Sequence, residues 1–195
     1  MNKLMGFFEL RKLDIPTVPW KEFKHGTVLD DSLLWTIRTA LVQGVDLNLP
    51  RSVGKDSEIS TAFAEKTLKV LKDNGMVIYY PYFIAEKSGT LNIFSNKIVI
   101  EAVKDDLWNL VTFSDRAVTI IINNNNKTYY GEKDFISEKE LNELLINVPR
   151  IKNIFKEYLL DGKSVLLEWS YAYNCDKNKN IVGNKYLVFY EVRTV

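Results

Sequence analysis

Three charged side chains stand inside the last two apolar segments of the chain. Glu168 falls in the middle of SVLLEW, and Glu191 and Arg193 stand two apart in YLVFYEVR. Because strand side chains alternate between faces, we expect Glu191 and Arg193 to share a face with Leu187 and Phe189. A carboxylate on a half-buried strand is costly unless it meets a cation or a metal ion. These two segments are therefore the first candidates for chemistry.

Two glutamates on neighbouring strands, with an arginine beside one of them, are suited to hold Mg²⁺ together with phosphate oxygens of a substrate. Arg38 ends another apolar segment, LLWTIR, and its guanidinium is suited to bidentate contact with phosphate. The alternative is structural: each glutamate pairs with an arginine or lysine across the sheet or lies at a solvated edge, and Arg38 forms a salt bridge or lies in water. The sequence leaves both interpretations open.

The segments that must position these side chains alternate between helical and strand patterns. Helical spacing of apolar residues covers 3–13, ended by Pro16 and Pro19, and covers 57–73. Ser137 and Glu140 form a capping box that starts another helix, and Pro149 opens the next. The expected strands are 33–38, 76–84, 91–94, 98–103, 107–113, 118–122, 165–173 and 185–193. This order predicts an α+β fold of mostly antiparallel sheets with about three to four helices.

The composition of the chain argues against several classes of protein. The chain has 195 residues, which suits one domain, and its formal charge of +1 argues against a nucleic-acid-binding face. The single cysteine excludes an internal disulfide framework, and the single histidine excludes a multi-histidine metal site. No apolar run reaches membrane-spanning length, and the first residues lack the pattern of a signal peptide. We therefore expect a cytoplasmic protein without nucleic-acid or membrane partners.

The order of several short segments resembles the ATP-grasp domain of phosphoenolpyruvate synthase and pyruvate phosphate dikinase. Lys3 and the segment 8–19 are similar to that family's opening "GGKGANLGEL…GIPVPPGF". The further similar segments are WTIRTA at 35–40 to "VRSSA", FA at 63–64 to "SFAG", 77–89 to "VVVQ.M…SGV", IEA at 100–102 with LV at 110–111 to "GLGE.VV.G", LEW at 167–169 to "DIEWA" and YEVRT at 190–194 to "Q.RP.T". Together they span nearly the entire chain in the family's order.

The resemblance implies a single ATP-grasp-like domain of two lobes, about 1–75 and 76–195, around a cleft that binds ATP and Mg²⁺. It implies that Lys3 contacts a phosphate, Arg38 the triphosphate and Arg193 a phosphate, that Tyr80, Pro81 and Tyr82 hold adenine, and that Glu168 and Glu191 bind Mg²⁺. The implied function is an ATP-dependent phosphotransferase module. Its partners would be the nucleotide and a separate acceptor, either a histidine-bearing protein or a small molecule.

The chain also departs from the family's pattern. Leu166 replaces the first carboxylate of "DIEWA", Glu191 replaces the glutamine of "Q.RP", Tyr80 replaces a hinge glutamine, and VKDDLW at 103–108 replaces the "GLGE" loop. These departures favour an alternative, a catalytically inactive binding or assembly protein that retains the fold. A third interpretation is an unrelated α+β domain. The loop 44–54, without a counterpart in the family, carries Arg51, which could contact a phosphate or carboxylate or belong to a mere connector.

Overall fold

The computed structural model describes residues 3–42, 49–107, 110, 115–124 and 126–195, and side chains from Met5 onward. Its helices are α1 (Lys3–Lys12), α2 (Ser57–Leu71), α4 (Glu138–Leu145), α5 (Val148–Ile154) and α6 (Lys156–Leu160), with the 3-10 turn η1 (Lys72–Asn74). Its strands are β1 (Lys21–Glu22), β2 (Trp35–Leu41), β3 (Ser52–Lys55), β4 (Gly75–Pro81), β5 (Phe83–Ile93), β6 (Lys97–Lys104), β7 (Val118–Asn123), β8 (Asn126–Gly131), β9 (Val165–Cys175) and β10 (Ile181–Thr194).

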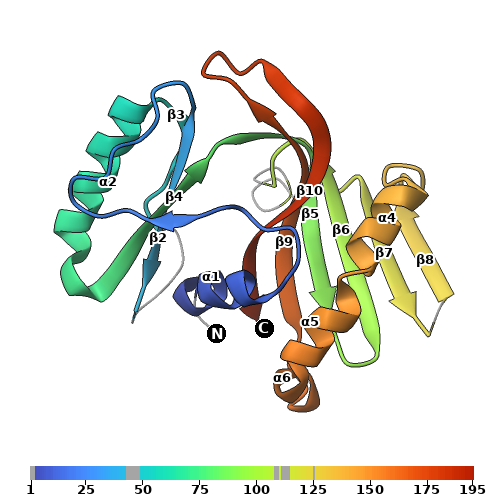
Figure 1. Cartoon of the computed structure of the whole chain (residues 1–195). Coiled ribbons are helices and arrows are strands. Elements are labelled where there is room, and N and C mark those ends of the chain that lie inside the picture. The colour runs from blue at the N-terminus through green and yellow to red at the C-terminus, as the bar shows by residue number, and fades with distance from the viewer. Residues whose placement is uncertain (1–2, 43–48, 108–109, 111–114, 125) are drawn as a thin grey trace.

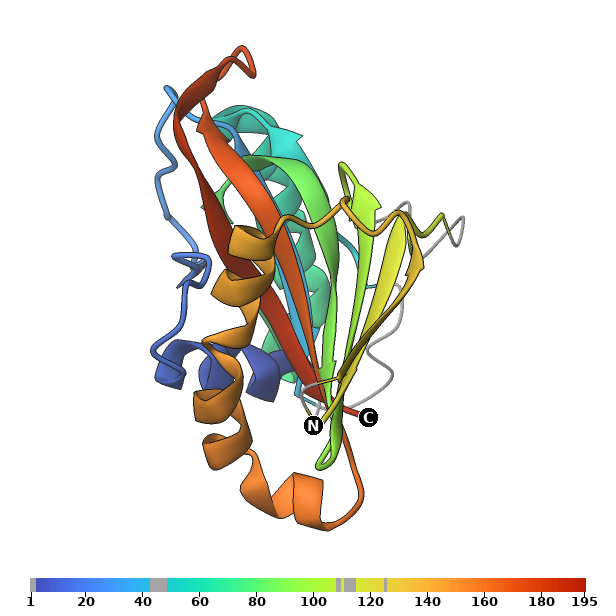
Figure 2. The same ribbon diagram turned by 90° about the vertical axis from the view of Figure 1, so that its right-hand side faces the viewer.

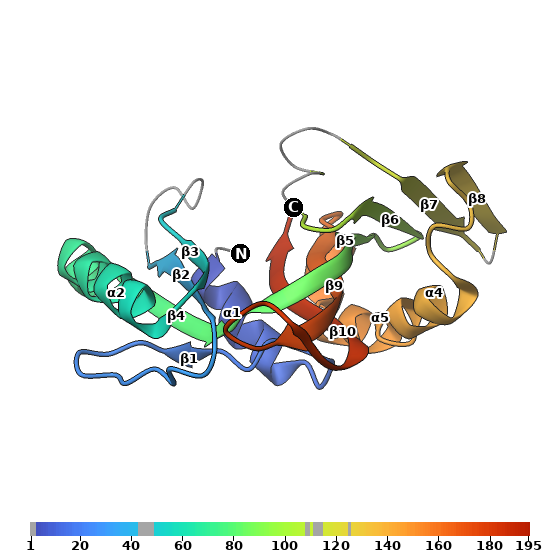
Figure 3. The same ribbon diagram turned by 90° about the horizontal axis from the view of Figure 1, so that it is seen from above.

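The strands form two sheets whose pairings are all antiparallel. The smaller sheet has the order β1-β4-β2-β3, and the larger has the order β10-β9-β5-β6-β7-β8. Helix α2 lies beside the smaller sheet, and α4, α5 and α6 run along one face of the larger sheet (Figures 1 and 2). Seen from above, the two sheets stand side by side with β5 leading from one to the other (Figure 3). The predicted α+β class with mostly antiparallel sheets is confirmed.

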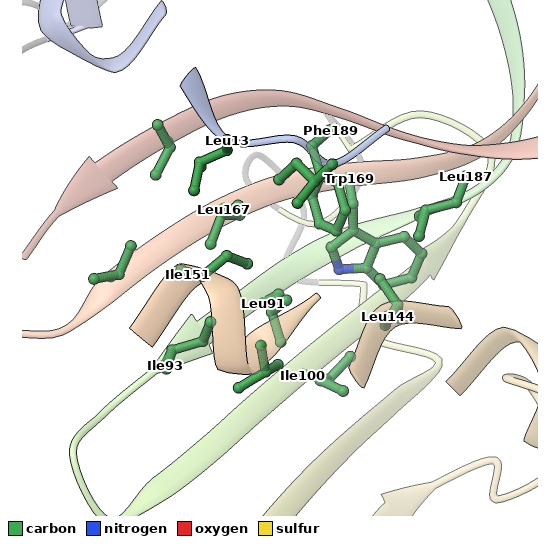
Figure 4. Close-up of a cluster of buried hydrophobic side chains, with 14 of the residues drawn as sticks. Leu13, Leu91, Ile93, Ile100, Leu144, Ile151, Leu167, Trp169, Leu187 and Phe189 are labelled. Carbon is green, nitrogen blue, oxygen red and sulfur yellow. The ribbon is translucent and has the colours of Figure 1, made fainter. Parts of the chain in front are cut away.

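The main hydrophobic core lies between the larger sheet and its helices. Trp169 is completely buried there, and α5 contributes the equally buried Ile151. Figure 4 shows Trp169 among Leu91, Ile100, Leu144 and Phe189, with side chains from strands and helices interleaved. Burial of this apolar surface is the main source of stability in a domain of this size. The capping box predicted at Ser137 starts α4 as expected, with Glu140 as its second member.

The chain changes sheets at Tyr82, where the sequence predicted one continuous strand over 76–84. Pro81 has no N–H to donate to a ladder, and β4 ends there. The Tyr82 N–H then donates to the Leu34 carbonyl, 2.8 Å away, and β5 begins at Phe83.

The strand expected at 91–94 is the end of this long β5. Of the strand expected at 107–113, residues 108–109 and 111–114 lie outside the described residues, and Leu107 is in a turn.

The beginning of the chain lies against its end. Helix α1 packs on β10 so closely that a Cβ at Gly6 would collide with the Val192 carbonyl oxygen. After α1, the segment around Thr17 bridges β10: the Phe189 N–H donates to the Pro16 carbonyl at 2.8 Å, and the Val18 N–H donates to the Phe189 carbonyl at 3.1 Å. Among the described helices, none is both long enough and apolar enough to span a membrane.

Candidate functional site

A cavity of about 690 Å³ lies between the two sheets. The smaller sheet and its connections line it with Arg38, Arg51 and Tyr80, among others, and the larger sheet lines it from β5, β9 and β10. This size is in the range of small-molecule and cofactor sites. The predicted site residues that line it are Arg38, Arg51, Tyr80, Tyr82, Glu168, Glu191 and Arg193. Pro81 is not part of the lining, and the Lys3 side chain lies outside the described residues.

The two predicted metal-binding glutamates are direct neighbours. Glu168 on β9 and Glu191 on β10 are cross-strand partners in the antiparallel ladder. Like charges at such a position repel each other unless cations offset them. Arg38 and Arg193 supply those cations. The site therefore contains a group of four alternating charges, which we call the charged quartet: Arg38, Glu168, Glu191 and Arg193.

Each glutamate of the charged quartet is paired with one arginine. The Arg38 Nη2 donates to the Glu191 Oε2 at 2.5 Å, and the Arg193 Nη2 lies 3.6 Å from the Glu168 Oε1. Only 13% of the Arg38 side chain and 4% of the Glu191 side chain are exposed. Both alternatives from the sequence thus describe part of this geometry, because the glutamates form ion pairs and also line a cavity. Ion pairing by itself leaves the metal-binding role of these residues a prediction.

Two buried polar atoms of the charged quartet have no hydrogen-bond partner among the residues described. They are the Glu191 Oε1, an acceptor, and the Arg193 Nε, a donor. Unsatisfied buried polar atoms are rare in proteins, and each one costs about 1–3 kcal/mol. Since both residues line the same cavity, a ligand that offers both a cation and an anionic oxygen would satisfy both atoms.

A bulge in β10 explains why Glu191 faces the cavity. Phe189 pairs with Trp169, but Glu191 pairs with Glu168, so Tyr190 is an extra residue in the ladder. Tyr190 and Glu191 therefore both line the cavity, whereas Phe189 lies in the core on the opposite face. The prediction from strict alternation, that Glu191 and Arg193 share a face with Leu187 and Phe189, is wrong for this reason.

Aromatic residues surround the charged quartet and modify its environment. The Tyr80 phenol lies within hydrogen-bonding reach of Arg38; burial raises its pKa, and Arg38 partly opposes that rise. Burial by itself would lower the Arg38 pKa, but Tyr80, Glu191 and Glu168 together raise it, so the guanidinium stays charged. Tyr82 is half-buried, and desolvation raises its pKa. Tyr80 therefore interacts with the charged quartet. The sequence predicted a different role for this residue, contact with adenine, which stays a prediction.

Sequence reasoning missed several polar residues of the cavity. Ser88 and Ser170 are buried and share a 2.8 Å hydrogen bond between their hydroxyls, and the Ser88 hydroxyl donates to the Asp105 carbonyl at 2.6 Å. Ser170 stands two residues after Glu168 on one strand, so alternation could have placed it on the cavity face. Asp105 and Asp106 also line the cavity, and their place in the turn after β6 gave no periodic signal.

Among the described residues, no group of three or more histidine, cysteine, aspartate or glutamate side chains could hold a metal ion. The donor set still fits Mg²⁺, which is commonly held by one or two carboxylates together with substrate phosphates and water. Glu168 and Glu191 supply two such carboxylates side by side, and the buried Glu191 Oε1 lacks another partner among the described residues. These oxygens are hard ligands of the kind that Mg²⁺ prefers.

Comparisons with known proteins identify the fold. No family model matches the chain, and no curated protein matches it in sequence. The D-alanine-D-alanine ligase from Helicobacter pylori aligns over 98% of this chain and 50% of its own, with 10% identity and a TM-score of 0.52. N5-carboxyaminoimidazole synthetase from Staphylococcus aureus aligns over 98% of this chain and 43% of its own, with 12% identity and a TM-score of 0.50.

The chain thus spans half or less of the length of these two structures. At such low identity the likeness concerns the fold and does not extend to substrate or reaction. It confirms the expectation of an ATP-grasp architecture, while the finer resemblance to phosphoenolpyruvate synthase stays a prediction. The protein has an α+β, ATP-grasp-like fold with two antiparallel sheets on either side of a cavity.

Proposed function

We propose that this cavity binds a magnesium–nucleoside triphosphate complex and that the chain is an ATP-dependent phosphotransferase module. The observation that carries the proposal is the unmatched pair of buried atoms in the charged quartet, one acceptor on Glu191 and one donor on Arg193. A metal–phosphate group offers a cation to the first and an anionic oxygen to the second. The ATP-grasp-like fold supports the same ligand independently.

The proposed roles follow from where each side chain lies. Glu168 and Glu191 hold the metal ion, and Arg38 and Arg193 neutralise the phosphate oxygens. When bound, Mg²⁺ would offset phosphate charge as the phosphoryl group leaves. Phosphoryl transfer depends mainly on positioning and on charge neutralisation. Two carboxylates for the metal ion and two guanidinium groups for the phosphates are the types of residue that these tasks need.

The remaining predicted residues are proposed to hold the rest of the nucleotide. Tyr82, which lines the cavity, supplies an aromatic wall for the base. The adenine contact that the resemblance implies for Pro81 stays a prediction, because Pro81 ends β4 outside the lining. Lys3 is proposed to contact a phosphate, as the resemblance implies. Arg51 lines the cavity from the residue just before β3 and is proposed as a further phosphate or carboxylate contact. The acceptor is proposed to be a separate histidine-bearing protein or a small molecule.

Calorimetric titration of the protein with ATP in the presence of Mg²⁺ tests this function. We expect binding that EDTA abolishes, and a loss of about 10-fold to 100-fold in affinity in Glu168→Gln and in Arg193→Gln. The first variant removes a carboxylate charge from the metal ion, and the second removes a charge-assisted hydrogen bond to a phosphate. Arg116→Gln is the matched control, since Arg116 pairs with Glu101 and does not line the cavity. Thermal unfolding of each variant separates loss of binding from loss of fold. Absence of binding by the folded wild-type protein contradicts the proposal.

A second candidate function is a catalytically inactive binding or assembly protein that retains the fold. The observation that favours it is that the charged quartet neutralises itself: two arginines pair with two glutamates without any ligand. In such a quartet the Arg38–Glu191 pair can simply join the two sheets. Incubation with labelled ATP and candidate acceptors discriminates between the two candidates, because sustained turnover excludes an inactive protein.

A further inference from the structure

The ion pair between Arg38 and Glu191 lies in the lining of the cavity and connects the two sheets. Arg38 lies on β2 of the smaller sheet, and Glu191 lies on β10 of the larger one. The 2.5 Å hydrogen bond occupies one oxygen of the Glu191 carboxylate and leaves the other buried without a described partner. A cation that binds this second oxygen therefore lies next to a guanidinium held by the other oxygen of the same carboxylate, and the two cations compete for Glu191.

We infer that Arg38 is a specificity-determining residue: paired with Glu191, it opposes the binding of a free divalent cation, while Glu168 and Glu191 oppose a free polyphosphate, so the site admits the complex of the two. The inference rests on the proposed function and adds that the site recognises the metal–polyphosphate complex and not the metal ion or the polyphosphate alone. It assigns to Arg38 a role in the unliganded protein as well as in the liganded one.

The charges of the site carry the argument. Arg38 and Arg193 contribute two positive charges, and Glu168 and Glu191 contribute two negative charges, so the charged quartet is neutral as it stands. A divalent cation by itself would add two positive charges next to two guanidinium groups. A polyphosphate by itself would add several negative charges next to two carboxylates. In a largely buried site, where charges are weakly screened, each of these additions is unfavourable, and adding both together removes most of the imbalance.

The surroundings of Arg38 allow an exchange of partners. Its guanidinium carbon lies 5.9 Å from the centre of the Phe7 ring, and the Tyr80 phenol lies within hydrogen-bonding reach. These contacts keep the guanidinium inside the cavity when it leaves Glu191. On binding of the complex, the Arg38 N–H group passes from the Glu191 oxygen to a phosphate oxygen, and the freed carboxylate turns to the metal ion. The ion pair is thereby replaced by two new charge-assisted contacts.

The wild-type protein provides the first test. Free Mn²⁺, detected by electron paramagnetic resonance, is titrated with protein alone, and a non-hydrolysable ATP analogue is titrated calorimetrically with EDTA present. We expect weak binding in both experiments and at least about 10-fold tighter binding when the metal and the analogue are supplied together, after correction for the complex that they form in solution. If Mn²⁺ and the analogue bind independently of one another, the inference is overturned.

The variant Arg38→Gln provides the second test. We expect Mn²⁺ alone to bind this variant at least about 10-fold more tightly than the wild type and to raise its melting temperature, because Glu191 has lost its cation. The double variant Arg38→Gln/Glu191→Gln should lose this gain, and Arg116→Gln should behave as the wild type. If Arg38→Gln does not fold without metal, its recovery on addition of Mn²⁺ measures the same gain, and the wild-type titrations decide independently.

The outcomes separate this inference from the proposed function. Equal Mn²⁺ affinity in the wild type and in Arg38→Gln overturns the role of Arg38, while binding of the metal–nucleotide complex by the wild type still supports the proposed site. If the wild type does not bind the complex at all, the proposed function fails, and the inference fails with it.

Discussion

Replacing Gly89 with valine is expected to leave little or no folded protein. Gly89 lies in β5 between Ala102 of β6 and Trp169 of β9 in the ladder. A Cβ at this position would collide with the Glu101 carbonyl oxygen and lie 2.5 Å from the Trp169 ring. Neither neighbour can move easily, since one is backbone and the other is a fully buried indole. We expect Gly89→Ala to lower the free energy of unfolding by about 3 kcal/mol. In Gly89→Val the larger side chain adds further clashes, and we expect their combined cost to exceed the free energy of unfolding of a typical domain, about 5–15 kcal/mol.

Urea denaturation monitored by tryptophan fluorescence measures the alanine variant, and the yield of soluble protein measures the valine variant. Gly183→Ala is a matched control. Gly183 has φ +80° with nothing near its missing Cβ, so the substitution costs only about 1 kcal/mol of backbone strain. Equal stability of the two alanine variants would show that the strands around Trp169 relax, which would contradict the close approach seen here.

Acid is expected to destabilise the protein through Glu140. This carboxylate is buried at the start of α4, a position that would raise its pKa, but hydrogen bonds from Lys87, Ser137 and Lys185 outweigh burial and lower it from 4.5 to about 2. A folded-state pKa below the unfolded-state value means that the stabilisation is complete above pH 4.5 and is lost as the pH falls toward 2. A shift of this size corresponds to about 3 kcal/mol. The Lys87 and Lys185 ammonium groups lie 2.8 Å and 3.0 Å from the carboxylate oxygens.

Other groups also face this carboxylate. Glu86 shares Lys185 with it at 3.0 Å, Tyr173 donates to Glu86 at 2.9 Å, and the Tyr171 hydroxyl donates to the Glu140 carbonyl at 2.6 Å. Because the pKa of Glu86 is also lowered, the test is the difference between wild type and Glu140→Gln.

We expect Glu140→Gln to lower the free energy of unfolding by about 3 kcal/mol at pH 7 and to reduce its dependence on pH between 5 and 3. Urea unfolding at several pH values measures both. Glu143→Gln, which changes a more exposed carboxylate in the same helix, should keep the wild-type dependence. A parallel fall of wild type and Glu140→Gln with acid would contradict the assignment.

The sequence predicted the elements better than their connections. Apolar spacing and capping signals located α1, α2 and α4, because these signals are local to each segment. The change of sheet at Tyr82 could not be predicted, since it depends on which carbonyl the Tyr82 N–H meets across the fold. The same holds for Gly89, whose need for a missing side chain comes from the strands on either side of it.

The candidate site was predictable by residue type and less so by geometry. A carboxylate inside an apolar strand is costly, and this physical reason singled out Glu168 and Glu191, both of which line the cavity. Their metal-binding role stays a prediction. Which face Glu191 occupies depends on the bulge at Tyr190, and no local signal in an apolar strand announces one extra residue. The pairing of Arg38 with Glu191 joins positions 153 residues apart, which only the folded arrangement reveals.

The hydrogen bonds between Phe189 and the segment around Thr17 have a consequence for how β10 can move. They use the N–H and the carbonyl of Phe189 on the outer side of β10, immediately before the bulge, while β9 pairs with β10 on the inner side. A slip of β10 by one residue would exchange Glu191 with Val192, placing a carboxylate in the hydrophobic core and an isopropyl group in the cavity. Anchored on both flanks, the strand is protected from sliding, and Glu191 keeps its place on the cavity face.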